Sequence, residues 1–198
     1  MEPTSPSAQP ISRFPVPEVA DLPEDLRDRI LLVQEKTGFV PNVFLAMAHR
    51  PAELRAFLAY HDALMEGDGP LTKAEREMVV VATSAARSCT YCVVAHGAIL
   101  RIRARDPHLA DLVATNHRQA GLPERQRRML DFAVTLSTTP ELVDEADLDG
   151  LRSVGFDDEA IWDISAITSF FALSNRMAHV MALRPNPEFH LLGRLPKR

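Results

Sequence analysis

Apolar residues recur along this chain at the spacing of amphipathic helices, and no segment alternates apolar and polar residues as a half-buried strand does. Proline, serine, threonine or aspartate precedes most of these segments, and glycine or proline follows many of them, as at the ends of helices. The pattern predicts helices over residues 24–36, 52–65, 73–87, 89–103, 124–136, 144–154 and 158–183, with one more after Pro107. We therefore expect an all-α, single-domain bundle of about eight helices.

The helix over 73–87 is expected to lie at the centre of the bundle. Residues Thr72 to Glu75 have the spacing of a capping box, in which the threonine and glutamate oxygens accept hydrogen bonds from free amides. Residues 78–86 are apolar or small on most faces, which is typical of a helix buried on several sides. Ser88 is the predicted N-cap of the next helix, which would begin at Cys89.

Both ends of the chain depart from the helical pattern. Five prolines lie among the first seventeen residues, where they remove amide donors and favour an extended path (Pro3, Pro6, Pro10, Pro15 and Pro17). After the last predicted helix, the segment 184–187 reads Arg-Pro-Asn-Pro and breaks the pattern. We expect a Pro-rich N-terminal arm over residues 1–20, one helical domain over 21–184 and a C-terminal tail over 185–198.

Composition narrows the class of protein. The 198 residues include 22 basic and 27 acidic side chains without a long run of like charge, so we expect neither a nucleic acid nor a membrane partner. No segment is long and apolar enough to span a membrane, and the N-terminus has no basic start followed by an apolar core. Two cysteines cannot hold a chain of this size together, so their value lies in reactivity, ligand binding or chance, and we expect a reducing, cytoplasmic setting.

The two cysteines are three residues apart, at Cys89 and Cys92, and His96 follows one helical turn later. Thiols at positions i and i+3 of a helix share a face and can alternate between a dithiol and a disulfide. The attacking species is the thiolate, which the positive end of a helix favours. His96 is the predicted acceptor of the proton from Cys92.

Glu77 joins this group only if the chain reverses direction near Ser88. Along one continuous helix, Glu77 and His96 would lie about 28 Å apart, too far for a proton to pass. If two helices fold back on each other, the carboxylate and the imidazole face each other. We then expect Glu77 to orient His96 and to stabilise its charged form.

Other interpretations of these residues stay open. The cysteines could be buried apolar residues, or Cys89 and Cys92 could bind zinc together with His96 and Glu77. His61 and His179 lie on predicted helices beside apolar residues and are interpreted as packing histidines. Asn175 and Arg176 interrupt an apolar helix and are interpreted as a structural ion pair or an oligomer contact.

The arrangement Glu77-x11-Cys89-x2-Cys92-x3-His96 resembles the signature of the AhpD-like alkylhydroperoxidases, within the carboxymuconolactone decarboxylase superfamily. Segments around and beyond these four residues are similar to the peroxidase-related branch of that family (71–77, 95–98, 39–42, 151–156 and 175–176). The resemblance implies an all-α fold that assembles into dimers, trimers or hexamers.

The same resemblance implies reduction of hydrogen peroxide or organic hydroperoxides without a bound cofactor. Cys92 would attack the peroxide, Cys89 would resolve the product as a disulfide, and Glu77 and His96 would relay protons. A thiol or a disulfide reductase of unknown identity would return the electrons.

Tyr91 departs from the pattern, because the founding enzymes carry a second histidine between the cysteines. With an unperturbed pKa of about 10, a tyrosine is not a base near neutral pH, but it could hydrogen-bond a peroxide oxygen or pack. Two other classes of function also stay open: a carboxymuconolactone decarboxylase-like enzyme, and a non-catalytic thiol-disulfide relay or binding protein.

Overall fold

The structure is a computed structural model that describes residues 10–194. Pro3 and Pro6 of the predicted arm and residues 195–198 of the predicted tail lie outside this range. Within it the chain forms nine α-helices and no strand, which confirms the all-α prediction. The helices are α1 (Glu24–Thr37), α2 (Asn42–Met47), α3 (Pro51–Met65), α4 (Lys73–Ala86), α5 (Thr90–Ala104), α6 (Leu109–Asn116), α7 (Glu124–Thr138), α8 (Glu145–Arg152) and α9 (Asp158–Met181).

The observed helix boundaries lie within two residues of those that the sequence predicts. The capping box is present: Thr72 Oγ1 accepts a hydrogen bond from the Glu75 amide, and Glu75 Oε2 accepts one from the Thr72 amide. The one additional helix is α2, which the sequence analysis did not predict. Its six residues between two loops are too few to show a helical period.

The predicted cap at Ser88 is wrong. Ser88 adopts a left-handed backbone conformation with φ 55°, whereas an N-cap has extended backbone angles. Cys89 occupies the N-cap position, and α5 begins at Thr90. The prediction of an N-cap at Ser88 failed because serine is common both at helix caps and in tight turns.

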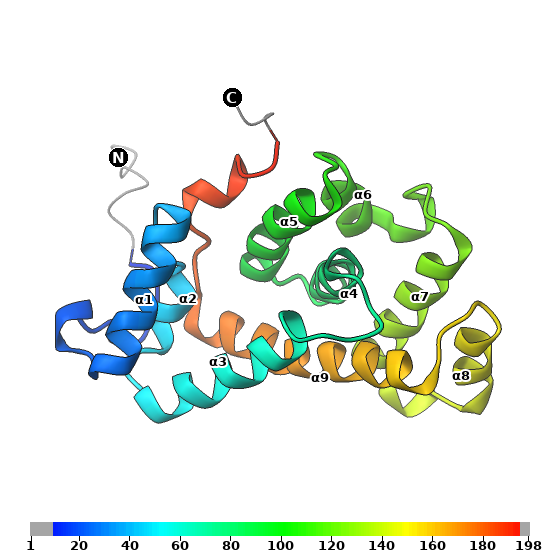
Figure 1. The fold of residues 1–198 in the computed structure, drawn as a ribbon, viewed down its shortest axis with the longest axis horizontal. Coiled ribbons are helices and arrows are strands. Elements are labelled where there is room, and N and C mark those ends of the chain that lie inside the picture. The colour runs from blue at the N-terminus through cyan, green and yellow to red at the C-terminus, as the bar shows by residue number, and fades with distance from the viewer. Residues whose placement is uncertain (1–9, 195–198) are drawn as a thin grey trace, which may run out of the picture.

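α4 is the central helix of the molecule. Figure 1 shows it nearly end-on, enclosed by α5, α6 and α7, with α9 running along one side. Ten of its fourteen residues are buried, including Met78 and the run of three valines after it. A helix that is buried on most faces cannot move without opening the core, so side chains on α4 are held in fixed positions.

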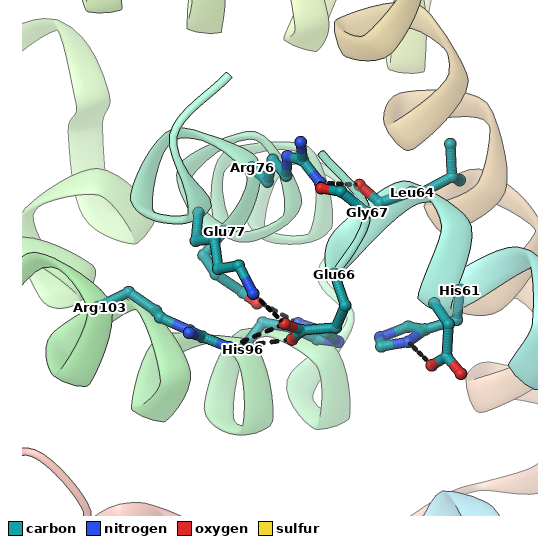
Figure 2. Close-up of polar contacts among 10 residues, drawn as sticks. His61, Leu64, Glu66, Gly67, Arg76, Glu77, His96 and Arg103 are labelled. Carbon is teal, nitrogen blue, oxygen red and sulfur yellow. Dashed lines mark hydrogen bonds and ion pairs between the residues drawn. The ribbon is translucent and has the colours of Figure 1, made fainter. Parts of the chain in front are cut away.

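A buried arginine ties the start of α4 to the loop before it. The Arg76 side chain is 2% exposed, and its guanidinium donates hydrogen bonds to the carbonyl oxygens of Leu64, Gly67 and Leu71 at 2.9, 2.7 and 3.3 Å. Figure 2 shows the first two of these contacts. They fix the end of α3 relative to α4, and therefore the side chains that the two helices direct toward each other.

After α9 the chain returns along α5. Asn186 accepts a hydrogen bond from the amide of Asn42 at 2.8 Å, and the Phe189 ring packs edge-on against Phe39 at 5.0 Å between centroids. The buried guanidinium of Arg101 on α5 donates to the Phe189 carbonyl oxygen at 2.8 Å. These contacts close a second apolar cluster around the two cysteines. Within residues 10–194, no helix combines the length and the hydropathy that a bilayer span requires.

Candidate active site

The corner between α4 and α5 reverses the chain. The Ser88 amide donates to the Ala85 carbonyl oxygen and the Cys89 amide to the Ser84 carbonyl oxygen, both at 2.9 Å. Ser88 has a left-handed backbone conformation at this corner, and the turn that it makes directs α5 back along α4. The reversal that the sequence analysis required is therefore present.

Because of this reversal, Glu77 and His96 form a direct contact. His96 Nδ1 lies 2.8 Å from Glu77 Oε2, and the two side chains are 13% and 6% exposed. An ionised carboxylate only accepts hydrogen bonds, so Nδ1 carries the hydrogen and Nε2 is left to accept or deliver a proton. Figure 2 shows the carboxylate of α4 directed at the imidazole of α5.

The two cysteines are free thiols and almost fully buried, at 1% and 2% exposure. The hydrogen bond from the Cys92 thiol lowers the pKa of Cys89 to about 7, and the Cys92 amide adds to this effect against the opposing effect of burial. The same thiol–thiolate hydrogen bond, together with burial, raises the pKa of Cys92. In the reduced protein the negative charge therefore belongs on Cys89 and the remaining proton on Cys92.

Buried polar groups of α4 and α9 surround Cys92. Ser174 Oγ lies 4.0 Å from Cys92 Sγ, and Ser84 Oγ donates to Asn175 Oδ1 at 3.0 Å. Asn175 is 2% exposed, so its contacts are made inside the chain. The interpretation of Asn175 as part of a structural ion pair or an oligomer contact was wrong, because α9 turns this side chain inward, where its oxygen accepts a hydrogen bond from Ser84.

His61 lies beside the Glu77–His96 pair, although its apolar sequence neighbours predicted only a packing histidine. Its ring centroid is 6.3 Å from that of His96, and both rings contact the edge or face of Phe171. Burial lowers the pKa of His61, and the neighbouring His96 lowers it further. No sequence signal links His61 to the motif, because it comes from α3 and only the packing of α3 against the bundle brings it close.

His179 of α9 lies near Cys89, and its electrostatic effect contributes to the lowered pKa of that thiol. The side chain is exposed, and its Nε2 forms a hydrogen bond with the Arg87 carbonyl oxygen at 3.0 Å. His179 is thus hydrogen-bonded, as expected, but it is exposed and not packed among apolar residues as predicted. Its neighbours along α9 are apolar, but the helix presents this position to the corner before α5.

Tyr91 is buried in the second apolar cluster and faces α2. Its hydroxyl oxygen accepts a hydrogen bond from the Val43 amide at 3.1 Å, and the residue is 5% exposed. Burial raises the pKa of Tyr91, so the hydroxyl keeps its proton. The tyrosine thus has a partner within the fold.

The four predicted site residues form two separate pairs, a carboxylate–imidazole pair and a thiol–thiolate pair. Among the described residues, no group of three or more histidine, cysteine, aspartate or glutamate side chains is arranged to hold a metal ion. The arrangement can move protons at one pair and electrons at the other.

Comparison with known proteins places this site in a family. Residues 51–114, which hold all four site residues, match the carboxymuconolactone decarboxylase family. A solved structure from Ralstonia eutropha JMP134, described as an alkylhydroperoxidase AhpD core and an uncharacterized peroxidase-related protein, is 64% identical over 96% of this chain and all of that one, with a TM-score of 0.94. The chain belongs to the AhpD-like proteins of the carboxymuconolactone decarboxylase family.

Two further solved structures extend the comparison. An uncharacterized peroxidase-related protein from Silicibacter sp. TM1040 is 42% identical over 94% of this chain and 97% of that one, with a TM-score of 0.89. The debrominase Bmp8 in complex with 2,3,4-tribromopyrrole is 19% identical over 91% of this chain and 97% of its own, with a TM-score of 0.76, and shows the shared fold alone. No curated protein matches the chain.

Proposed function

We propose that this AhpD-like protein is a dithiol peroxidase that reduces hydrogen peroxide or an organic hydroperoxide. The observation that carries the proposal is a thiol pair with one low pKa, buried at the start of α5 and followed one turn later by a carboxylate-bound imidazole. A thiolate is the nucleophile that attacks a peroxide oxygen, and an imidazole can carry the proton that the reaction moves. The descriptions of two similar structures, both peroxidase-related, support the same chemistry.

In the proposed first step Cys92 attacks the peroxide. Its sulfur forms a bond to the outer oxygen while the O–O bond breaks, which gives a sulfenic acid and an alcohol or water. The Cys92 proton passes to His96 Nε2 and then to the leaving oxygen. Glu77, 2.8 Å from Nδ1, stabilises the imidazolium that exists between these two transfers.

In the second step the Cys89 thiolate attacks the oxidised sulfur of Cys92. A disulfide forms, the S–O bond breaks, and the oxygen leaves as water after taking up a proton. The low pKa of Cys89 suits this role, because the resolving thiolate is already ionised near neutral pH. The raised pKa of Cys92 supports the use of a base in the first step, because this thiol keeps its proton near neutral pH.

The fold by itself does not select this reaction. Bmp8 has the same fold and is a debrominase, so the proposal rests on the thiols and their proton relay. Decarboxylation of a lactone, the reaction in the family's description, uses no thiolate. Conversion of a lactone by a variant in which both cysteines are replaced would favour a decarboxylase.

The test is to titrate the reduced protein with peroxide and count its thiols by mass spectrometry. We expect the loss of two thiols per chain and the appearance of a Cys89–Cys92 disulfide. In Cys89→Ser, a stable sulfenic acid should form on Cys92, and the double variant should consume no peroxide. A sulfenic acid that forms only in Cys92→Ser would reverse the assignment, and unreactive thiols in the wild type would refute the peroxidase.

A further inference from the structure

A pocket opens beside Cys89, between the first turn of α5 and the last turns of α9. Its volume is 280 Å³, and its walls are Cys89, Thr90, Tyr91, Ala178, His179, Ala182 and Leu183. Neither Cys92 nor the Glu77–His96 pair forms part of these walls. A molecule that enters here therefore meets Cys89 and not the proton relay.

His179 supplies the one imidazole of this pocket. Its Nε2 lies 3.0 Å from the Arg87 carbonyl oxygen, which can only accept a hydrogen bond. Nε2 therefore carries the hydrogen, and the neutral ring keeps its lone pair on Nδ1. This tautomer is the one that can remove a proton from a molecule approaching Cys89.

The pocket is suited to a small, uncharged ligand. None of its wall residues is a lysine, arginine, aspartate or glutamate, and the two alanines and the leucine give it apolar sides. A charged group placed here would lose water without gaining an ionic partner. Drug-sized ligands occupy cavities of about 300–1,000 Å³, so a cavity of 280 Å³ suits a smaller molecule.

We propose that this pocket receives the thiol that returns electrons to the protein, that the thiol is an uncharged alkyl thiol, and that His179 is its general base. The inference rests on the dithiol–disulfide cycle of the proposed function. It adds the pocket that receives the electron donor and a catalytic residue, His179, outside the family motif.

The step is a thiol–disulfide exchange. His179 Nδ1 takes the proton of the entering thiol, whose sulfur forms a bond to Cys89 Sγ while the Cys89–Cys92 bond breaks. Cys92 leaves as a thiolate and takes up a proton. A second alkyl thiol then attacks the mixed disulfide at the alkyl sulfur, which releases Cys89 as a thiolate and an alkyl disulfide as the product.

The first experiment compares thiols of similar size and different charge. The protein is oxidised with diamide, without peroxide, and reduced by 2-mercaptoethanol, 2-mercaptoethanesulfonate or cysteamine at equal concentrations of the protonated thiol. We expect 2-mercaptoethanol to reduce the disulfide at least about tenfold faster than either charged thiol. Equal rates for the three thiols would refute the uncharged donor.

The second experiment tests the base. In His179→Ala the rate of reduction by 2-mercaptoethanol should fall about 100-fold, the low end for loss of a general base, and added imidazole should restore part of it. The control is His190→Ala, which removes an exposed imidazole that lines a different pocket and should leave the rate unchanged. A His179→Ala rate equal to wild type, or one that imidazole does not raise, would overturn the role of His179.

A third variant tests the pocket without removing the base. Ala182 is exposed, so Ala182→Leu should fill the pocket while the fold is retained, and it should slow reduction by 2-mercaptoethanol. An unchanged rate contradicts entry at this pocket. Diamide forms the disulfide without peroxide, so a selective and base-dependent reduction would support the donor pocket even if peroxide failed to oxidise the protein. Failure of diamide to form the disulfide would refute both the donor pocket and the dithiol peroxidase.

Discussion

The thiol of Cys92 should control the acidity of Cys89, and its removal tests the electrostatics of the site. Its hydrogen bond to the Cys89 sulfur is the largest cause of the low Cys89 pKa, while burial acts in the opposite direction. In Cys92→Ala the side-chain donor is lost, but the amide of residue 92 and the two nearby imidazoles remain. The pKa of Cys89 should therefore rise from about 7 toward its ordinary value of 9.0.

The size of the change follows from these two values. At pH 7 a thiol of pKa about 7 is about half ionised, whereas one of pKa 9.0 is about 1% ionised. Ionisation alone would slow alkylation about 50-fold, but thiolate nucleophilicity rises with pKa by about tenfold over two units. We therefore expect the alkylation rate at pH 7 to fall only about fivefold, while the titration midpoint moves by up to about two units.

The assay is a pH titration of the ultraviolet absorbance of the thiolate, together with the rate of alkylation by iodoacetamide. Cys92→Ser is the matched control, because its hydroxyl can still donate to the Cys89 thiolate and should give a smaller shift. In all variants the thiolate should appear as the pH rises through the midpoint and disappear below it. A midpoint that stays near 7 in Cys92→Ala would refute the account of the thiol pair.

Three further predictions concern Glu77, Tyr91 and Thr72. Glu77→Gln should slow peroxide-driven oxidation about 10- to 100-fold in stopped-flow measurements, because His96 loses a charge-assisted hydrogen bond. Tyr91→Phe should lower the free energy of unfolding by about 1–3 kcal/mol in urea denaturation, because the Val43 amide loses its acceptor, while the oxidation rate is unchanged. Thr72→Ala should lower the free energy of unfolding by about 1 kcal/mol through loss of the α4 cap.

A matched control variant and a result that would contradict the prediction can be named for each of the three substitutions. Glu66→Gln removes a carboxylate from a half-exposed ion pair with Arg103 and should leave oxidation unchanged, so an equal loss in both variants would argue against a special role for Glu77. A Tyr91→Phe variant with normal stability and slow oxidation would instead place the hydroxyl on the peroxide. Thr115→Ala, at an exposed position of α6, should change stability by less than about 0.5 kcal/mol, and a similar change in Thr72→Ala would contradict the cap.

Local signals predicted most of the helices. Several local signals mark helix starts that the structure confirms: the Thr72 and Asp157 caps, Pro23 before α1, Pro51 at the first position of α3 and Pro123 before α7. These devices act within a few residues, so the sequence displays them directly. The short helix α2 and the left-handed conformation of Ser88 were not predicted, because neither produces a periodic pattern in the sequence.

The candidate site was only partly visible in the sequence. Glu77 and His96 could be paired because a single reversal at one corner joins adjacent helices, and the structure has that reversal. His61 and His179 come from α3 and α9, far from the motif along the chain, and they reach it through tertiary packing. Periodicity and spacing describe one helix at a time, so they do not reveal such neighbours.

The packing of His61 against His96 explains how the proposed relay confines its proton. A positive charge on one imidazole disfavours a charge on the other, and burial together with His96 lowers the pKa of His61. Glu77 contacts His96 at 2.8 Å, so an imidazolium formed there by a proton from Cys92 would have a carboxylate partner. In the proposed reaction, a proton taken from Cys92 therefore stays beside Glu77 until the leaving oxygen accepts it.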